Sequence, residues 1–398
     1  MSSRRWYGKG TLRKVAFSAA LTVAGLEAAL WLLHPLSVFP EEWRCDYTQD
    51  LPGLKRKVTY ERNMFGFRSV SGARARSAKK PPGAVRIICL GASTTDLPTQ
   101  NAEDTWWGIL EKRLNDEFRP EGRRVEVWAR GRGGETAADA LRWARHDLRS
   151  YAPDIVVLLQ GVNDLCWHGG RGYTGAPEPG DAALPRKEWG GYPKWKLCLR
   201  QVSQIYRHAS ALRQRWRVRE AIREGAAVEW HSGALPLLRQ EHLQRPFRET
   251  LARDPDPIHE FGGRIQDLLT HLRASGVRCV VCEQPVLWSA DLPEETRKCL
   301  WMPVATPSGF VRASPGWLAG EMAKYNRMQE AAALRSGARF VELASRLPRT
   351  PEMFFDDCHY TDLGNRRMAE AIFPALGDEV RLAIAGTSRP AGAGGEGK

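Results

Sequence analysis

Five short apolar runs, separated by stretches with helical periodicity, constrain the fold of this chain most strongly. Each run is only a few residues long and reads as a strand buried on both faces. The runs are Val85–Leu90, Val125–Ala129, Ile155–Gln160, Val277–Glu283 and Arg339–Leu343. Amphipathic patterns predict helices at Thr105–Phe118, Thr136–Leu148, Phe261–Ala274, Gly320–Arg335 and Asp362–Phe373. Asp104 is the expected N-cap of the first of these helices. This alternation predicts an α/β fold with three layers and a doubly wound parallel five-stranded sheet.

One interval breaks the alternation. More than a hundred residues separate Gln160, at the end of the third predicted strand, from Val277, at the start of the fourth. A crossover needs far fewer residues, so about 166–257 is predicted to be a large insertion. It contains the basic run Leu199–Glu224, with seven Arg and two Glu. This run suits a lid or a surface facing glycan or membrane, and equally a solvated helix face over a small satellite core.

The N-terminus contains the longest apolar run of the chain. Residues 15–34 are predicted to be a transmembrane signal anchor, because Val15–Leu33 carries only one charge, Glu27, and has nearly the length of a span. The preceding residues 1–14 are basic and free of acids, so they are expected to stay in the cytoplasm. A cleaved signal peptide and a buried soluble helix are the alternatives. Glu27 is the weak point, since an acid inside a span is costly.

Composition excludes several classes of protein. The chain has 398 residues, of which 42% are hydrophobic and 26% charged, so it is neither wholly disordered nor collagenous. A single long apolar run, with a mean hydropathy of −0.44, excludes a protein with many membrane spans. The net charge of +13 permits a polyanionic partner. No nucleic-acid motif accompanies it, and no nucleic-acid partner is expected.

Four polar blocks are expected at one rim, because ligands of such sheets bind beyond the carboxyl ends of the strands. Ser93 follows the first predicted strand, in the turn Gly91-Ala92-Ser93. The glycine-rich stretch 130–136 follows the second strand, and Asn163 follows the third. Asp356 and His359, three residues apart before the last helix, suit an imidazole held through Nδ1. Taken singly, each block is equally well explained as a turn, a cap or a surface pair.

Together, these blocks resemble the SGNH (GDSL-type) hydrolases over roughly residues 60–380. The match consists of GAST, GRGGET, GVND and DDCH in this order, with Gln284-Pro285 and Tyr325-Asn326 as further similarities. The family resemblance implies a flavodoxin-like sheet order and an esterase or lipase activity. The sequence departs from the family at Ala92, Thr94 and Ala129. None of these three positions takes part in proton transfer. The departures therefore bear on substrate preference more than on catalytic activity.

The resemblance also implies roles for individual residues. Ser93 would be the nucleophile, His359 the base and Asp356 its partner, with Asp357 as the neighbouring rival for the last role. The oxyanion would lie among the Ser93 N–H, the Gly134 N–H and the Asn163 amide. No metal and no cofactor are expected, and the pair Cys279 and Cys282 is read as part of a buried strand.

The expected organisation has five parts. These are a cytoplasmic basic segment (1–14), the transmembrane anchor (15–34), a juxtamembrane segment (35–84), the hydrolase domain (85–381) and a disordered tail (382–398). The expected function is an ester hydrolase in the cell membrane, with its catalytic domain on the periplasmic or extracellular side. Its substrate would be an acyl ester of a glycan or a lipid. An O-acyltransferase for exported polysaccharide and a non-catalytic glycan-binding scaffold are the alternatives.

Overall fold

The computed structural model describes residues 9–33, 44–51, 54–63, 65–72, 75, 78–167, 199, 202–210, 212–213, 243–251, 257–306 and 309–387. The chain divides into two compact units. One joins Met1–Trp43 to Ala182–Val228, and the other joins Arg44–Asp181 to Glu229–Lys398. The predicted tail beyond residue 387 and most of the predicted insertion lie outside the described residues.

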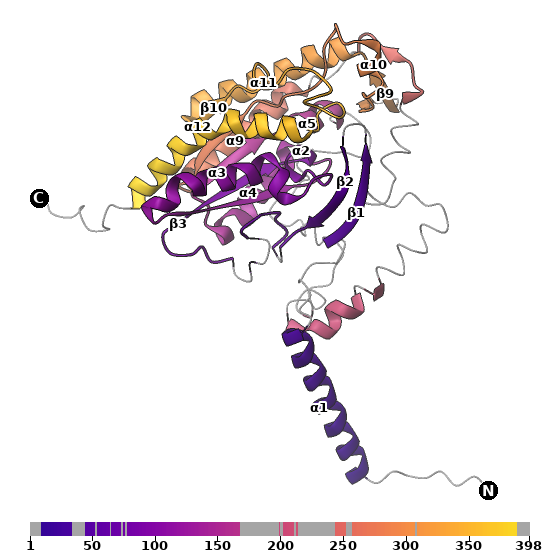
Figure 1. The fold of residues 1–398 in the computed structure, drawn as a ribbon, viewed down its shortest axis with the longest axis vertical. Helices are drawn as coiled ribbons and strands as arrows, with labels where there is room; N and C mark the ends of the chain where they lie inside the picture. The colour runs from indigo at the N-terminus through magenta and orange to yellow at the C-terminus, as the bar shows by residue number, and fades with distance from the viewer. Residues whose placement is uncertain are drawn as a thin grey trace, which may run out of the picture. The chain divides into compact units, whose positions relative to one another are not determined.

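A five-stranded sheet forms the centre of the larger unit (Figure 1). Its spatial order is β10-β7-β5-β3-β4, and every neighbouring pair is parallel. The strands are β3 (Ala84–Gly91), β4 (Arg124–Gly131), β5 (Ile155–Leu159), β7 (Arg278–Cys282) and β10 (Arg339–Val341). All five predicted strands are therefore present. Of these five strands, the first along the chain, β3, lies between the second, β4, and the third, β5, which is the flavodoxin-like order.

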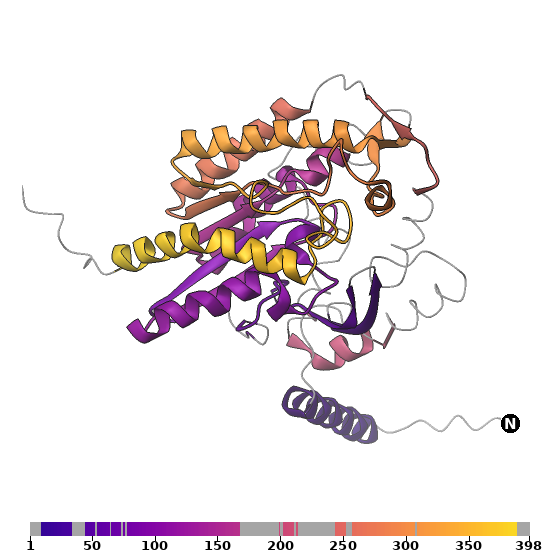
Figure 2. The ribbon, with the colours of Figure 1, turned by 45° about the horizontal axis from the view of Figure 1, so that its top comes forward.

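Helices cover both faces of this sheet, which confirms the three-layer α/β fold (Figure 2). On one face α3 (Trp106–Phe118) packs against α12 (Asp362–Thr387). On the other face α9 (Ile258–Ala274) packs against both α4 (Ala137–Tyr151) and α11 (Pro315–Ser336). The strands between them are buried, with β5 fully so. Their near-continuous apolar sequences follow from this double cover.

The last helix is longer than its pattern predicted. The expected helix ended at Phe373, and residues from 382 onward were assigned to a disordered tail, whereas α12 continues through Pro374 to Thr387. Ala383 and Ile384 pack against the core. Residues 382–387 are thus helical because their apolar side chains still have a surface to cover.

The start of α3 also differs from expectation. Asp104 was the expected N-cap, but the cap is Thr105, whose side chain accepts a hydrogen bond from the Gly108 N–H. The prediction was wrong because the Asp104 carboxylate is engaged elsewhere. It accepts hydrogen bonds from Arg56, at 2.8 Å, and from Asn101, at 3.2 Å.

The larger unit begins well before the expected domain start at residue 85. An antiparallel hairpin of β1 (Arg44–Leu51) and β2 (Leu54–Glu61) lies in the stretch that was assigned to a juxtamembrane segment. Val58, Tyr60 and Phe67 from this stretch are buried. The Phe67 ring lies 5.2 Å from that of Trp128 in β4, so this stretch is part of the folded unit.

Shorter elements surround the rim of the sheet. They are α2 (Ser93–Asp96), α5 (Val162–Trp167), α10 (Glu294–Arg297), β6 (Phe247–Arg248), β8 (Val304–Thr306) and β9 (Gly309–Ala313). The last three form a small sheet in which β9 is central. Part of the predicted insertion, through β6, therefore pairs with the segment that follows α10.

In the smaller unit, α1 (Lys9–Leu33) contains the predicted anchor. Among the described helices, it is the one long and apolar enough to cross a membrane, over Arg13–Leu33, and none of that stretch is buried.

Candidate active site

Ser93 opens the short helix α2, directly beyond the carboxyl end of β3. Two glycines allow the chain to turn there. A Cβ on Gly91 would lie 2.1 Å from Thr95 Oγ1 and 2.7 Å from the Leu159 carbonyl oxygen. A Cβ on Gly131, at the end of β4, would lie 2.3 Å from the Asp96 nitrogen. The turn that presents Ser93 is therefore wedged between β4 and β5, and it needs glycine on two sides.

Gly134 and Asn163 lie beyond the two strands that flank β3. In the sheet register, Gly91 pairs with Gly131 on one side and with Leu159 on the other. Gly134 has a φ of +80°, which a residue with a Cβ rarely adopts. The Asn163 side chain donates a hydrogen bond of 2.8 Å to the carbonyl oxygen of Glu135, next to Gly134. The Asn163 side chain is thus fixed to the residue that follows Gly134, the other predicted oxyanion donor.

Asp164 fixes the start of α4 to the same rim. Its carboxylate oxygens accept hydrogen bonds from the Ala137 N–H at 3.0 and 3.2 Å. The side chain is fully buried, and this burial raises the pKa of Asp164 to about 7. The helix that follows the glycine-rich stretch therefore depends on a buried carboxyl next to Asn163.

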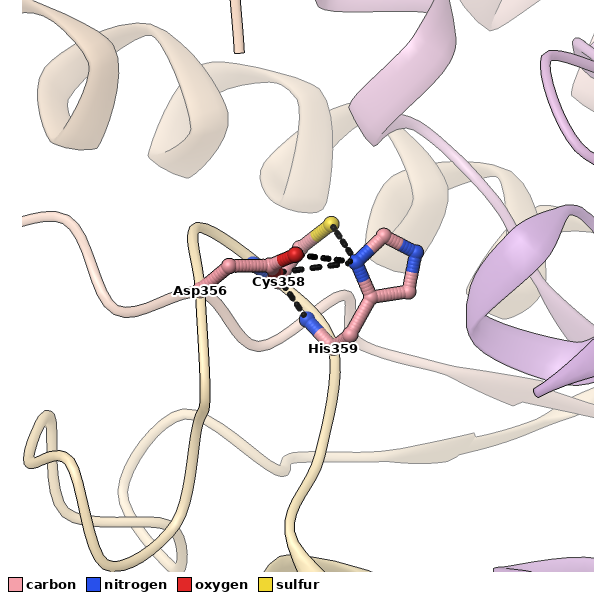
Figure 3. A group of neighbouring side chains, drawn as sticks. All are labelled: Asp356, Cys358 and His359. Carbon is pink, nitrogen blue, oxygen red and sulfur yellow. Dashed lines mark hydrogen bonds and ion pairs between the residues drawn. The ribbon is translucent and has the colours of Figure 1, made fainter. Parts of the chain in front are cut away.

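Asp356 and His359 form a buried pair in the loop before α12 (Figure 3). His359 Nδ1 lies 2.8 and 3.0 Å from the two carboxylate oxygens of Asp356. Because a carboxylate only accepts, Nδ1 carries the proton and Nε2 is left as the basic nitrogen. Backbone N–H groups of Cys358 and His359 also donate to Asp356, at 3.1 and 3.0 Å. The loop thus fixes both the tautomer and the ring plane.

Two groups outside this loop complete the surroundings of the pair. The Trp301 indole N–H donates to Asp356 Oδ2 at 3.1 Å. The Phe355 ring stacks on the His359 ring, with centroids 5.7 Å apart and an angle of 15°. A buried, multiply hydrogen-bonded carboxylate beside one imidazole nitrogen suits a base that must accept and return a proton.

Asp357 has a different task from Asp356. Its oxygens accept from the Trp288 indole N–H at 2.8 Å and from the Trp301 and Met302 backbone N–H groups at 2.8 and 3.1 Å. Burial, with the neighbouring charge of Asp356, raises the pKa of Asp357 to about 6. Asp357 therefore ties the loop to the segment after β7, while Asp356 is the residue on the imidazole.

Gln284, just beyond β7, connects the serine turn to the histidine loop. Its side-chain oxygen lies 3.4 Å from the hydroxyl of Thr94, the neighbour of Ser93. Its amide donates to the hydroxyl of Tyr360, the neighbour of His359, at 3.3 Å. Gln284 therefore bridges the residues next to Ser93 and His359.

A second connection runs through Gln100 and Asn365. Gln100 donates to the Tyr360 carbonyl oxygen at 2.9 Å, and Asn365 donates to Gln100 at 2.6 Å. The Asn365 side-chain oxygen accepts from the Trp106 N–H at 2.9 Å. The start of α3 and the histidine loop are therefore held in one network. The Trp106 indole N–H extends this network to the serine turn, because it donates to the Thr94 carbonyl oxygen at 3.1 Å.

Sequence reasoning missed two buried arginines. Arg62 pairs with Asp96 at 2.8 Å and donates to the Gly131 carbonyl oxygen at 2.6 Å. Arg68 donates to the carbonyl oxygens of Leu97 and Gln100, each at 2.7 Å. Both precede the expected domain start, yet they hold the serine turn. The signal was the sequence YERNMFGFRSV, where aromatic residues alternate with arginines as in a buried layer.

The same loop has a donor set that resembles a metal site. Ligand atoms of Asp356, Cys358 and His359 lie within 4.8 Å of one another. However, burial and the two neighbouring aspartates raise the pKa of the Cys358 thiol, and a metal needs the thiolate. The Asp356 oxygens are also engaged by four donors. This donor set fits proton transfer better than metal binding.

Comparison with known proteins identifies the family of this chain. The family model described as GDSL-like Lipase/Acylhydrolase matches residues 89–367. The chain belongs to this family, which confirms the resemblance seen in the sequence. Family membership supports hydrolysis of ester bonds as its activity. No curated protein sequence matches the chain.

Similar solved structures share little sequence with the chain. An acetyl xylan esterase, AlAXEase, is 14% identical, with a TM-score of 0.40, 73% of this chain covered and 100% of that one. The psychrotrophic esterase EstA from Pseudoalteromonas sp. is 10% identical, with a TM-score of 0.39 and coverages of 74% and 98%. A putative acylhydrolase from Bacteroides fragilis is 15% identical, with a TM-score of 0.36 and coverages of 80% and 94%.

Proposed function

We propose that this chain is a membrane-anchored serine ester hydrolase with Ser93, His359 and Asp356 as its catalytic residues. The observation that carries the proposal is the buried Asp356–His359 pair, which Gln284 connects to the turn bearing Ser93. A neutral serine hydroxyl is a weak nucleophile and needs an adjacent base. The fixed tautomer supplies such a base at Nε2.

The chemistry follows from these positions. Ser93 Oγ attacks the ester carbonyl while its proton moves to His359 Nε2, and Asp356 stabilises the resulting imidazolium. The carbonyl oxygen becomes an oxyanion that accepts hydrogen bonds from the Ser93 N–H, the Gly134 N–H and the Asn163 amide. His359 then returns the proton to the leaving alcohol. Water, activated by the same imidazole, releases the acid and restores Ser93.

We further propose that the enzyme acts outside the cytoplasm on O-acyl esters of a glycan or a lipid. The support is α1, which is long and apolar enough to span a membrane, and the basic residues before it, which favour a cytoplasmic N-terminus. A panel of acetylated sugars and longer acyl esters, with product analysis in the presence of an added sugar acceptor, distinguishes hydrolysis from acyl transfer.

The nucleophile is tested with Ser93→Ala. We expect hydrolysis of an aryl acetate to fall by about 10⁴-fold or more, because the attacking oxygen is lost. Labelling by a fluorophosphonate should disappear as well. Ser345→Ala, at an exposed position, is the control and should retain both. Full activity and full labelling in Ser93→Ala, with the fold intact, would remove Ser93 from the mechanism.

A further inference from the structure

Glu27, the acid that made the predicted span costly, has a partner in the smaller unit. Its carboxylate accepts hydrogen bonds from the Ser203 hydroxyl at 3.0 Å, from the Ile205 N–H at 3.1 Å and from the Gln204 N–H. Ser203–Ile205 begin a helical segment that comes from the predicted insertion. The contact gives hydrogen-bond donors to a carboxylate that lipid would leave unsolvated. It also gives an acceptor to backbone N–H groups at a helix start, which have no partner within their own helix.

A second contact repeats the first one turn further along both segments. The Arg207 guanidinium lies over the Trp31 ring, 4.8 Å from its centroid. Trp31 follows Glu27 by four residues, and Arg207 follows Ser203 by four, so each pair shares one helix face. Gln204 and Arg207 are buried against α1, at 0% and 4% exposure. The two contacts together define a docked pair of segments.

The depth of this contact follows from helix geometry. Glu27 precedes Leu33, the last residue of the span, by six positions, about 9 Å along the helix axis. A segment bonded to Glu27 is therefore held about 9 Å below the level of Leu33. Amphipathic helices that lie in a membrane interface are buried to a similar depth, about 5–10 Å. Trp31, only two residues before Leu33, lies nearer the membrane interface, where tryptophan is enriched.

The outward face of the segment has the chemistry of a lipid-binding surface. Leu199, Val202 and Leu212 are exposed although they are apolar, with Val202 at 67% exposure. The surrounding run, Leu199–Glu224, has seven Arg and two Glu. Apolar side chains beside an excess of positive charge suit the boundary between acyl chains and anionic headgroups.

The geometry points to the described part of Leu199–Arg213 (199, 202–210 and 212–213) as a membrane-interface segment. Glu27 holds it at the outer boundary between headgroups and acyl chains, where it contacts anionic phospholipid. This inference rests on the proposed anchor and extends it, because the insertion then binds the same membrane that α1 crosses. It does not depend on the ester chemistry, so loss of hydrolysis would leave it standing.

The test places a photo-crosslinking phenylalanine analogue at single positions of the full chain, in nanodiscs of phosphatidylcholine and phosphatidylglycerol. Lipid adducts are measured by mass spectrometry. Position 21, at mid-span, should label strongly. Position 202 should label at least about fivefold more than position 334, which is matched in exposure (Leu334, 70%; Val202, 67%) and lies in the larger unit. Labelling at 21 but only background at 202 would overturn this inference alone. Background labelling at 21 would overturn the anchor as well.

Variants of Glu27 test what holds the segment. Glu27→Leu removes the acceptor and improves the span, so labelling at 202 should fall toward that at 334 while labelling at 21 persists. Glu27→Gln keeps an acceptor oxygen and should preserve most of the labelling at 202. Unchanged labelling at 202 in Glu27→Leu would overturn the role of Glu27. Retained aryl acetate hydrolysis in each variant shows that the larger unit is folded.

Discussion

Adjacent aspartates in the histidine loop have separate tasks. Asp356 holds the His359 imidazole, and Asp357 holds the segment that follows β7. Each also accepts one indole N–H, from Trp301 and Trp288 respectively. Sequence alone left the choice between the two aspartates to a motif. The choice depends on a tight loop and on two distant tryptophans, which spacing along the chain does not reveal.

The tryptophan pair gives a matched test at the residue scale. Trp301→Phe removes the donor to Asp356 Oδ2, which leaves more negative charge facing Nδ1. We expect the acid limb of the kcat/KM profile, which reports protonation of the base, to move to higher pH. The free energy of unfolding should fall by about 1–3 kcal/mol. The measurement is kcat/KM from pH 4 to 9 with a denaturant titration.

Trp288→Phe is the control for that experiment. It removes an equivalent indole donor from Asp357, so it should lower the stability by a similar amount while the acid limb stays at the wild-type pH. Coincident profiles for the two variants would show that Trp301 has only a structural role.

Asn163→Ala tests the oxyanion site. We expect kcat to fall by about 10²–10³-fold with little change in KM, because this amide would bind charge that exists only in the transition state. Steady-state kinetics with an aryl ester measure both constants. An unchanged kcat with a raised KM would instead make Asn163 a substrate-binding residue.

At the scale of elements, the site is built from the carboxyl ends of β3, β4 and β5. Ser93, Gly134 and Asn163 each follow one of these strands, and the register brings the strand ends level. Because the loops after these strands are short, the positions of Ser93, Gly134 and Asn163 are rigidly fixed. These positions are for the same reason sensitive to any atom added at the neighbouring glycines.

Gly131→Ala tests this crowding. The added Cβ would lie 2.3 Å from the Asp96 nitrogen and 2.5 Å from the Ala92 carbonyl oxygen, so the turn bearing Ser93 must shift. We expect a loss of about 1–3 kcal/mol in unfolding free energy and a large loss of kcat. Gly263→Ala, in α9 with nothing within 4 Å of its new Cβ, should be neutral or stabilising by up to about 1 kcal/mol. Equal denaturation midpoints for the two variants would contradict this account.

The five strands were predictable because runs such as Ile155–Leu159 are apolar throughout and short. Convergence of the blocks was predictable because parallel strands end at one edge. The support provided by Arg62 and Arg68 was not, since most of their partners at the serine turn are backbone carbonyl oxygens, with Asp96 as the exception. The sequence can indicate that this stretch is buried, but it does not identify carbonyl partners. The contact between Glu27 and Ser203 was not predictable either. The two residues lie about 175 positions apart along the chain, and only folding brings them together.

For the whole molecule, a buried carboxyl links stability to pH. The pKa of Asp164 is raised to about 7 in the fold, against 3.8 when exposed. The fold favours the protonated form of Asp164. The stability that Asp164 contributes to the folded state is therefore fully present below about pH 4 and is lost as the pH rises through 7. Arg264 opposes this rise and Asp139 adds to it.

Asp164→Asn isolates that contribution. Asn keeps an oxygen for the Ala137 N–H but cannot ionise. We expect the variant to lose less stability than the wild type between pH 4 and 7, by at most about 4 kcal/mol at 1.36 kcal/mol per pH unit. Urea titrations at several pH values measure the difference. Parallel curves for the two proteins would mean that Asp164 titrates in the fold as it does in the unfolded chain.

The hairpin upstream of the sheet bears on how the enzyme should be produced. The family match starts at residue 89, which invites a shortened recombinant version cut close to that point. Such a fragment would discard Arg62 and Arg68, whose guanidinium groups hold the turn that bears Ser93. Expression without the anchor should therefore start no later than Arg44, where the larger unit itself begins.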